Sequence, residues 1–268
     1  MVAAALSALV RVAAGSAAPA QARHTAGQGA PAGGDSLPSL CPPGTLPDNG
    51  VCIPVPNGQP GGAALQAEQN GHHERSGHWR VYDQIPRRPD RPANYRRYRY
   101  PVPPEPGQSL VMSGYDLDRP DYEQRRGPGL KAVGHGGIDL AEPRGTRVRL
   151  VDLAHQVGNA EVLYVGPLFG NTLVTRHTLR EGGHLREYLV LYGHLQGPAP
   201  GLTKGMTVKQ GALLGFVGDS GSAGVVHLHL EVRRVRQGEN PADFKPREIV
   251  ENSRTVVCDP RNVLPLHK

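Results

Sequence analysis

Short runs of alternating apolar and polar residues follow one another in the second half of the chain, and glycines separate them. This alternation has the two-residue period of a strand that buries one of its faces. No run between 101 and 268 has the length and period of an ordinary helix, and the glycines between Met206 and Val217 suit tight turns. We therefore expect a mainly β domain of antiparallel sheets over 101–268. Its predicted strands lie within 146–150, 161–165, 172–177, 186–195 and 225–232.

The first hundred residues lack this periodicity. Residues 23–74 are rich in Gly, Pro, Ala and Gln, which is typical of a linker, and 75–100 interleave tyrosines with arginines. We predict that 23–100 form a largely disordered linker whose last part is a basic arm. Such an arm is either solvated or binds an anionic wall polymer. Arginine beside tyrosine also suits nucleic acid, but the arm alone does not justify that function.

Composition adds a preference for anionic partners. The 268 residues carry a net charge of +6, with 35 glycines and 26 prolines, and the isoelectric point is about 9.4. No stretch reaches the ~18 apolar residues that a transmembrane helix needs. We therefore expect no transmembrane segment.

The N-terminus and the cysteines point to export. Residues 1–22 are Ala-rich and end in Ala20-Gln21-Ala22, which resembles a signal-peptidase site. Cys41 and Cys52 flank the turn signal Asp48-Asn49-Gly50, so a small disulfide loop is expected in an oxidising compartment. Zinc binding by these two thiols is the weaker alternative, because two further ligands are not close in the sequence.

The run from Val225 to Val232 reads Val-Val-His-Leu-His-Leu-Glu-Val. In a strand, His227 and His229 share one face while the leucines pack on the other. Imidazole serves as a metal ligand and as a general base near neutral pH. A pair of histidines on a strand is more often structural, so the metal hypothesis needs partners elsewhere in the chain.

The stretch from Val133 to Leu140 offers such partners. In an extended chain His135, Gly137 and Asp139 share a face, and the bare Gly137 leaves room for a small ion or a substrate backbone. One histidine of the 227/229 pair would complete a set of two imidazoles and a carboxylate. This set suits zinc and leaves a fourth position open for water, which indicates catalysis.

Three motifs now stand in order along the chain: His135-x-x-x-Asp139, Tyr192-Gly-His194-Leu195 and His227-Leu-His229. Their order and spacing resemble those of the LytM/lysostaphin-type zinc metallopeptidases, bacterial enzymes that cut peptidoglycan peptides. Secondary matches are Pro143-x-Gly145, Gly170-Asn171, His177 and the closing Asp259-Pro260. The resemblance covers roughly 131–260, the expected core of the domain.

This resemblance implies a site and a function. It implies antiparallel sheets that form a groove, in the manner of a duplicated hybrid motif, and one zinc ion bound by His135, Asp139 and His229. His194 and His227 become unliganded catalytic histidines, whose division of roles stays open. The implied function is that of an exported zinc metalloendopeptidase of the periplasm or cell envelope that hydrolyses peptidoglycan cross-links. A domain that recruits or activates another wall hydrolase is the alternative, although such relatives typically lack some metal ligands.

Other histidines receive structural expectations. His177 matches a family position without being a ligand, so we expect a hydrogen-bonding role inside the fold. His155 and His184 are expected at the surface.

Overall fold

The structure is a computed structural model that describes residues 45–48, 51–54, 64–73, 79–103, 110–117 and 134–267. The predicted signal peptide 1–22 and Cys41 lie outside these residues. Within them, no helix has the length and apolar character needed to cross a membrane.

The described part of the chain is mainly β, as predicted, and its only helices are short 3-10 turns. A separate antiparallel pair is formed by β1 (Thr45–Asp48) and β2 (Val51–Pro54). The remaining strands belong to one twelve-stranded sheet. They are β3 (Glu68–His73), β4 (Trp79–Ile85), β5 (Val111–Ser113), β6 (Gly137–Leu140), β7 (Arg147–Arg149), β8 (Ala160–Leu168), β9 (Gly170–Glu181), β10 (His184–Pro198), β11 (Thr207–Val208), β12 (Leu213–Val217), β13 (Leu228–Val235) and β14 (Thr255–Cys258).

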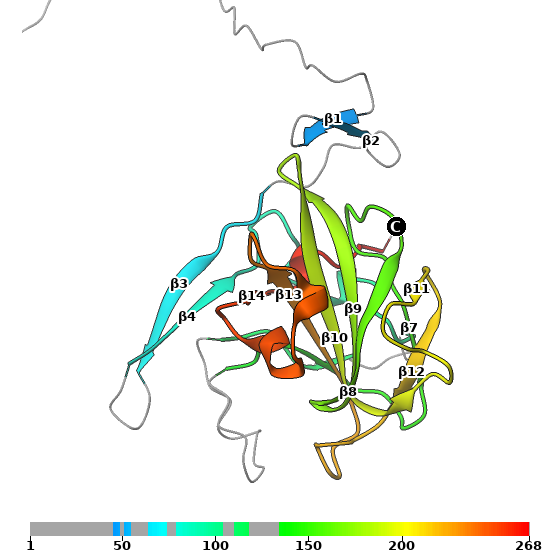
Figure 1. Cartoon of the computed structure of the whole chain (residues 1–268). Coiled ribbons are helices and arrows are strands. Elements are labelled where there is room, and N and C mark those ends of the chain that lie inside the picture. Colours follow the sequence, from blue (N-terminus) through cyan, green and yellow to red (C-terminus); the bar gives the residue numbers. More distant parts are fainter. Residues whose placement is uncertain are drawn as a thin grey trace, which may run out of the picture. The chain divides into compact units, whose positions relative to one another are not determined.

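The sheet follows the order β11-β8-β9-β10-β13-β14-β4-β3, and the long strands β9 and β10 run side by side through it (Figure 1). β12 branches from β10 and also pairs with β7, while β6 lies between β13 and β5. The pairs are antiparallel, as expected, except that β4 and β14 run parallel, so the sheet is mixed. The 3-10 turns are η2 (Tyr95–Arg97), η3 (Pro241–Asp243), η4 (Pro246–Val250) and η5 (Pro260–Asn262).

Strand β13 holds the central position. It pairs with β10 along one edge and with β6 and β14 along the other, so its backbone hydrogen bonds are made on both sides. Leu228, Leu230 and Val232 are at most 1% exposed and lie in the main core cluster. The strand begins at Leu228, three residues later than predicted, because Val225 closes a turn back to the carbonyl of Ser222.

Residues 79–103 pack on this domain, although their composition is that of a basic linker. Ile85, Tyr98 and Val102 are buried in the main core cluster. Burial of these three side chains removes a large apolar surface from water. This favourable free energy holds the segment on the domain although the neighbouring residues are basic. Residues 79–103 are therefore part of the folded domain.

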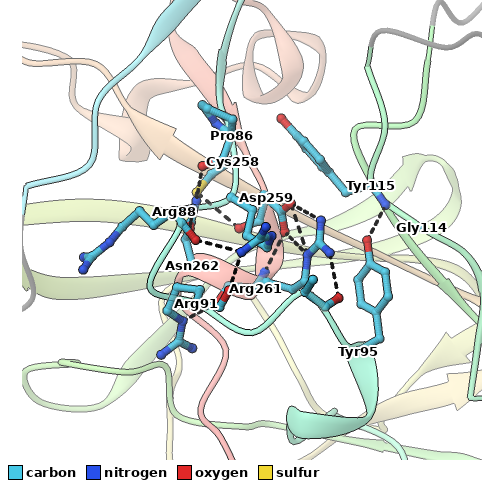
Figure 2. A network of polar contacts seen from close by, with 12 residues as sticks. Pro86, Arg88, Arg91, Tyr95, Gly114, Tyr115, Cys258, Asp259, Arg261 and Asn262 are labelled. Carbon is cyan, nitrogen blue, oxygen red and sulfur yellow. Dashed lines mark hydrogen bonds and ion pairs between the residues drawn. The ribbon is translucent and has the colours of Figure 1, made fainter.

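A polar network ties this segment to the C-terminal end of the chain, as Figure 2 shows. The guanidinium of Arg261 bonds to the carboxylate of Asp259, donates to the carbonyl of Ala93 at 3.0 Å and lies 4.3 Å from the ring centroid of Tyr95. Asn262 accepts from the amide of Arg88 at 2.9 Å and donates to the carbonyl of Pro86 at 2.8 Å. These bonds fix the backbone of 86–95 against η5.

Candidate metal centre

Three side chains converge at the middle of β13. The Nε2 atom of His135, an oxygen of Asp139 and the Nδ1 atom of His229 form a triangle with sides of 3.0 to 3.2 Å. No other cluster of three metal-binding side chains occurs in the part of the chain that the structure describes. The three residues named from the sequence are therefore brought together.

The triangle fits a zinc ion. A tetrahedral site with zinc–donor distances of about 2.0–2.2 Å places neighbouring donor atoms about 3.3–3.5 Å apart. The observed sides are shorter than this by only a few tenths of an ångström. Two imidazole nitrogens and one carboxylate oxygen are also a donor set that zinc takes in hydrolytic sites, where a fourth position stays open.

The sheet itself sets this geometry. Asp139 in β6 lies directly opposite His229 in β13, and both side chains stand on one face. Between His135 and Asp139, the position of Gly137 faces the ring of His229, since a Cβ there would lie 2.9 Å from its Cε1 atom. The same Cβ would lie 2.5 Å from the carbonyl oxygen of Leu230. Strand β13 therefore occupies the space beside Gly137. The expectation that this space admits a small ion or a substrate backbone is wrong.

Each proposed histidine ligand is held at its far nitrogen. Nδ1 of His135 donates to the carbonyl of Gly114 at 2.8 Å, and Nε2 of His229 lies 3.3 Å from the carboxylate of Glu231. Because a carbonyl or carboxylate oxygen can only accept, these bonds leave the other nitrogen of each ring free to bind a metal. Gly114 and Glu231 were not named from the sequence as parts of the site. Glu231 could have been predicted, because the alternation along the strand places it on the same face as His227 and His229.

Glu231 belongs to a buried charge network. Its second oxygen accepts from Nη1 of Arg233 at 2.5 Å, and Arg233 also donates to Thr255 at 2.6 Å and to the carbonyl of Val250 at 3.0 Å. Burial would raise the pKa of Glu231, but the charge of Arg233 and the hydrogen bond from His229 lower it to about 2. The carboxylate is therefore ionised and fixed in place at neutral pH.

The same contacts shift the metal-free ligands. Burial would lower the pKa of His229, but hydrogen bonds to Asp139 and Glu231 raise it to about 9. Burial would raise the pKa of Asp139, but hydrogen bonds from His135 and His229 hold it well below its ordinary value. Without a metal, the centre consequently holds a proton between these groups.

His194 and His227 lie beside this centre. The ring centroids of the two histidines are 4.6 Å apart, and Nε2 of His227 lies 3.7 Å from the same oxygen of Asp139. His194 has a positive φ of 56°, in the left-handed region that side chains rarely adopt. Its amide donates to the carbonyl of Phe169, whose ring contacts His229. A strained backbone held this way is a frequent property of functional positions.

These two histidines use the same ring nitrogen for their backbone hydrogen bond. Nδ1 of His194 donates to the carbonyl of Ser220 at 2.8 Å, and Nδ1 of His227 donates to that of Val225 at 2.9 Å. In the neutral form of either ring, the remaining Nε2 atom therefore carries the lone pair. Burial lowers the pKa of His194 to about 4, so this ring is neutral at pH 7.

His177 does not take part. It is buried, bonding to Thr175 at 2.7 Å and to Gln156 at 2.8 Å, which confirms the structural role expected for it. Burial lowers its pKa to about 3. His155 and His184 are exposed, also as expected.

A sequence model of peptidase family M23 matches residues 133–243. This range contains all five residues named for the site.

Solved structures give similar matches. A zinc-containing peptidase from Vibrio cholerae is 27% identical, with a TM-score of 0.36, over 61% of this chain and 43% of that one. The catalytic domain of the antimicrobial peptidase lysostaphin from Staphylococcus simulans is 22% identical, with a TM-score of 0.31, over 54% and 85%. The catalytic domain of the M23 protein EnpA from Enterococcus faecalis is 22% identical, with a TM-score of 0.33, over 54% and 97%. The chain thus spans less than half of the Vibrio cholerae protein.

Proposed function

Residues 133–243 belong to peptidase family M23, and from this we propose that the chain is a zinc metalloendopeptidase that hydrolyses peptide bonds in peptidoglycan cross-links. The observation that carries the proposal is the triangle of His135, Asp139 and His229, with the outer nitrogen of each histidine already bonded. A ligand set with fixed outer bonds is pre-organised for a metal.

The metal and the two unliganded histidines, His194 and His227, have separate roles in the reaction. When bound, zinc supplies a Lewis acid that lowers the pKa of water towards ~7 and polarises a peptide carbonyl. His227 accepts the proton of the attacking water at Nε2, because its Nδ1 is committed to Val225. The Nε2 atom of His194, on β10, carries the equivalent lone pair. The ring that has gained a proton can then donate it, to the developing oxyanion or to the leaving amine.

Digestion of purified sacculi by the zinc-loaded protein tests the proposal, with the fragments identified by mass spectrometry. We expect cleavage products and one zinc ion per chain. His135→Ala should lose the metal, whereas His194→Ala and His227→Ala should keep it and lose at least about 10²-fold in rate. His184→Ala, at an exposed histidine, is the matched control. Binding to sacculi without cleavage at any zinc concentration would instead favour the activator function.

The proposal includes export to the periplasm or cell envelope. The Ala-rich residues 1–22 and the Cys41–Cys52 pair support it from the sequence. N-terminal sequencing and thiol counting of protein isolated from the envelope test both features. An intact Met1 with three free thiols would contradict them.

A second partner completes the proposal. The basic and aromatic residues of 75–100, with the net charge of +6, support an anionic wall polymer as a ligand distinct from the scissile peptide.

A further inference from the structure

A cavity of about 720 Å³ lies beside β5. Neither the three proposed metal ligands nor the two histidines beside them line it. Its walls include the rings of Tyr95 and Tyr100 and the apolar side chains of Val102, Leu110 and Val111. These walls are mostly apolar. The volume exceeds what a single inorganic anion fills.

Four arginines also line this cavity: Arg96, Arg99, Arg147 and Arg149. Arg147 and Arg149 point out from the same face of β7, because the buried Val148 lies between them. Within the described residues, none of the four forms an ion pair with a carboxylate. Asp152 lies within electrostatic reach of Arg99, but burial raises the pKa of this carboxyl. Four positive charges gathered in this way repel one another, and an anion would relieve the repulsion.

The aromatic wall is held in place before any ligand arrives. The guanidinium of Arg261 covers the ring of Tyr95, whose hydroxyl accepts from the amide of Tyr115 at 3.0 Å. The hydroxyl of Tyr100 donates to the carbonyl of Tyr95 at 2.8 Å. Figure 2 shows Tyr95 within this network. A preformed wall loses little conformational entropy on binding.

We propose that this cavity binds an anionic saccharide, a sugar chain that bears carboxylates or phosphates. A sugar ring has an apolar C–H face that suits tyrosine and aliphatic walls, and its charged groups match the planar fork of arginine. Arg96, Arg147 and Arg149 are exposed, so they meet the ligand at the mouth. The site gives the anionic partner of the proposed function a defined place, and its ligand binding requires neither the metal nor hydrolysis.

The cavity and the metal centre share one short strand. Val111 at the start of β5 lines the cavity, and Ser113 at its end lies 3.0 Å from Nδ1 of His135. A chain of sugars held in the cavity would therefore pass close to the peptidase site.

Titration calorimetry of the full metal-free chain at 150 mM salt tests the site, with hexagalacturonate as the carboxylated probe and maltohexaose as its neutral counterpart. We expect hexagalacturonate to bind and maltohexaose to bind at least tenfold more weakly. Equal affinity for the two sugars, or no binding of hexagalacturonate, overturns the proposal.

A pair of double variants separates a site from general charge attraction. Arg147→Gln with Arg149→Gln removes two charges from the cavity, and Arg97→Gln with Arg186→Gln removes two charges that do not line it. We expect the first to weaken hexagalacturonate binding at least tenfold and the second to change it less than twofold. The same loss in both contradicts a localised site.

Leu110→Trp fills the cavity without changing charge. We expect it to weaken hexagalacturonate binding at least tenfold. Undiminished binding would mean that the ligand lies outside the cavity, which overturns the proposal. Vesicles of phosphatidylglycerol and polyuridylate are run in parallel. If either binds through Arg147 and Arg149 while hexagalacturonate does not, the ligand is a lipid or a nucleic acid, and the saccharide is excluded.

Discussion

Asp139 and His229 face each other across the antiparallel pair of β6 and β13, with an oxygen of Asp139 3.0 Å from Nδ1 of His229. Their separation is therefore set by the register of the two strands. A slip of one residue would turn one of the two side chains to the opposite face and remove the site.

Gly137→Ala should disturb this register. The new methyl group would meet the carbonyl of Leu230 at 2.5 Å and the ring of His229 at 2.9 Å. We expect the free energy of unfolding to fall by about 1–3 kcal/mol, with weaker zinc binding. Thermal unfolding and a chelator competition measure the two effects. Gly197→Ala is the matched control, since nothing lies within 4 Å of its Cβ position. An equal response of the two variants would refute the argument.

Glu231→Gln should weaken zinc binding by about 10- to 100-fold, because the carboxylate orients the His229 ring. The variant should also lose stability, since the buried Arg233 is left without its charge partner. Competition with a chromophoric chelator gives the affinity, and chemical denaturation gives the free energy of unfolding.

The double variant Glu231→Gln, Arg233→Gln separates the two effects. With neither charge present, we expect part of the stability to return while zinc binding stays weak. Recovery of zinc affinity along with stability would mean that Glu231 only supports the fold.

Zinc affinity should rise with pH. In the metal-free protein the pKa of His229 is about 9, but a ligand histidine must be neutral, so binding releases its proton below that pH. We expect the apparent affinity to increase by up to about tenfold per pH unit from pH 7 to 9 and to level off above. A constant affinity over this range would contradict the proton count.

Acid should destabilise the metal-free protein through His177. Its folded pKa of about 3 is below the ordinary value of 6.5, so the unfolded chain binds the proton more tightly. This contribution to stability is present above pH 6.5 and is lost as the pH falls towards 3, at up to about 1.4 kcal/mol per pH unit. His177→Gln should flatten this part of the stability curve, whereas His184→Gln at the surface should leave it unchanged.

Local alternation predicted β7, β8, β9, β10 and β13, and the resemblance of three motifs to a known family named the three side chains that meet at the centre. The same alternation failed at Val225, where a turn to Ser222 delays the strand. It also could not reveal that Gly114 holds His135, because that bond joins residues 21 positions apart through a backbone carbonyl. The packing of Tyr98 and Ile85 escaped prediction for a related reason. Composition averages over a segment, while burial depends on a few apolar residues and on the partner surface that receives them.

The parallel pairing of β4 with β14 makes completion of the sheet depend on residues that are far apart in the chain. Gln84 pairs with Val257, and Arg88 bonds to Asn262, 174 residues further along the chain. Such distant contacts form slowly and only when both ends are available. Because β14 also flanks the strand that carries His229, residues 79–85 and 255–258 must meet before the sheet beside the metal centre is complete. The sheet that carries the metal centre is therefore completed only through slow, distant contacts between β4 and β14.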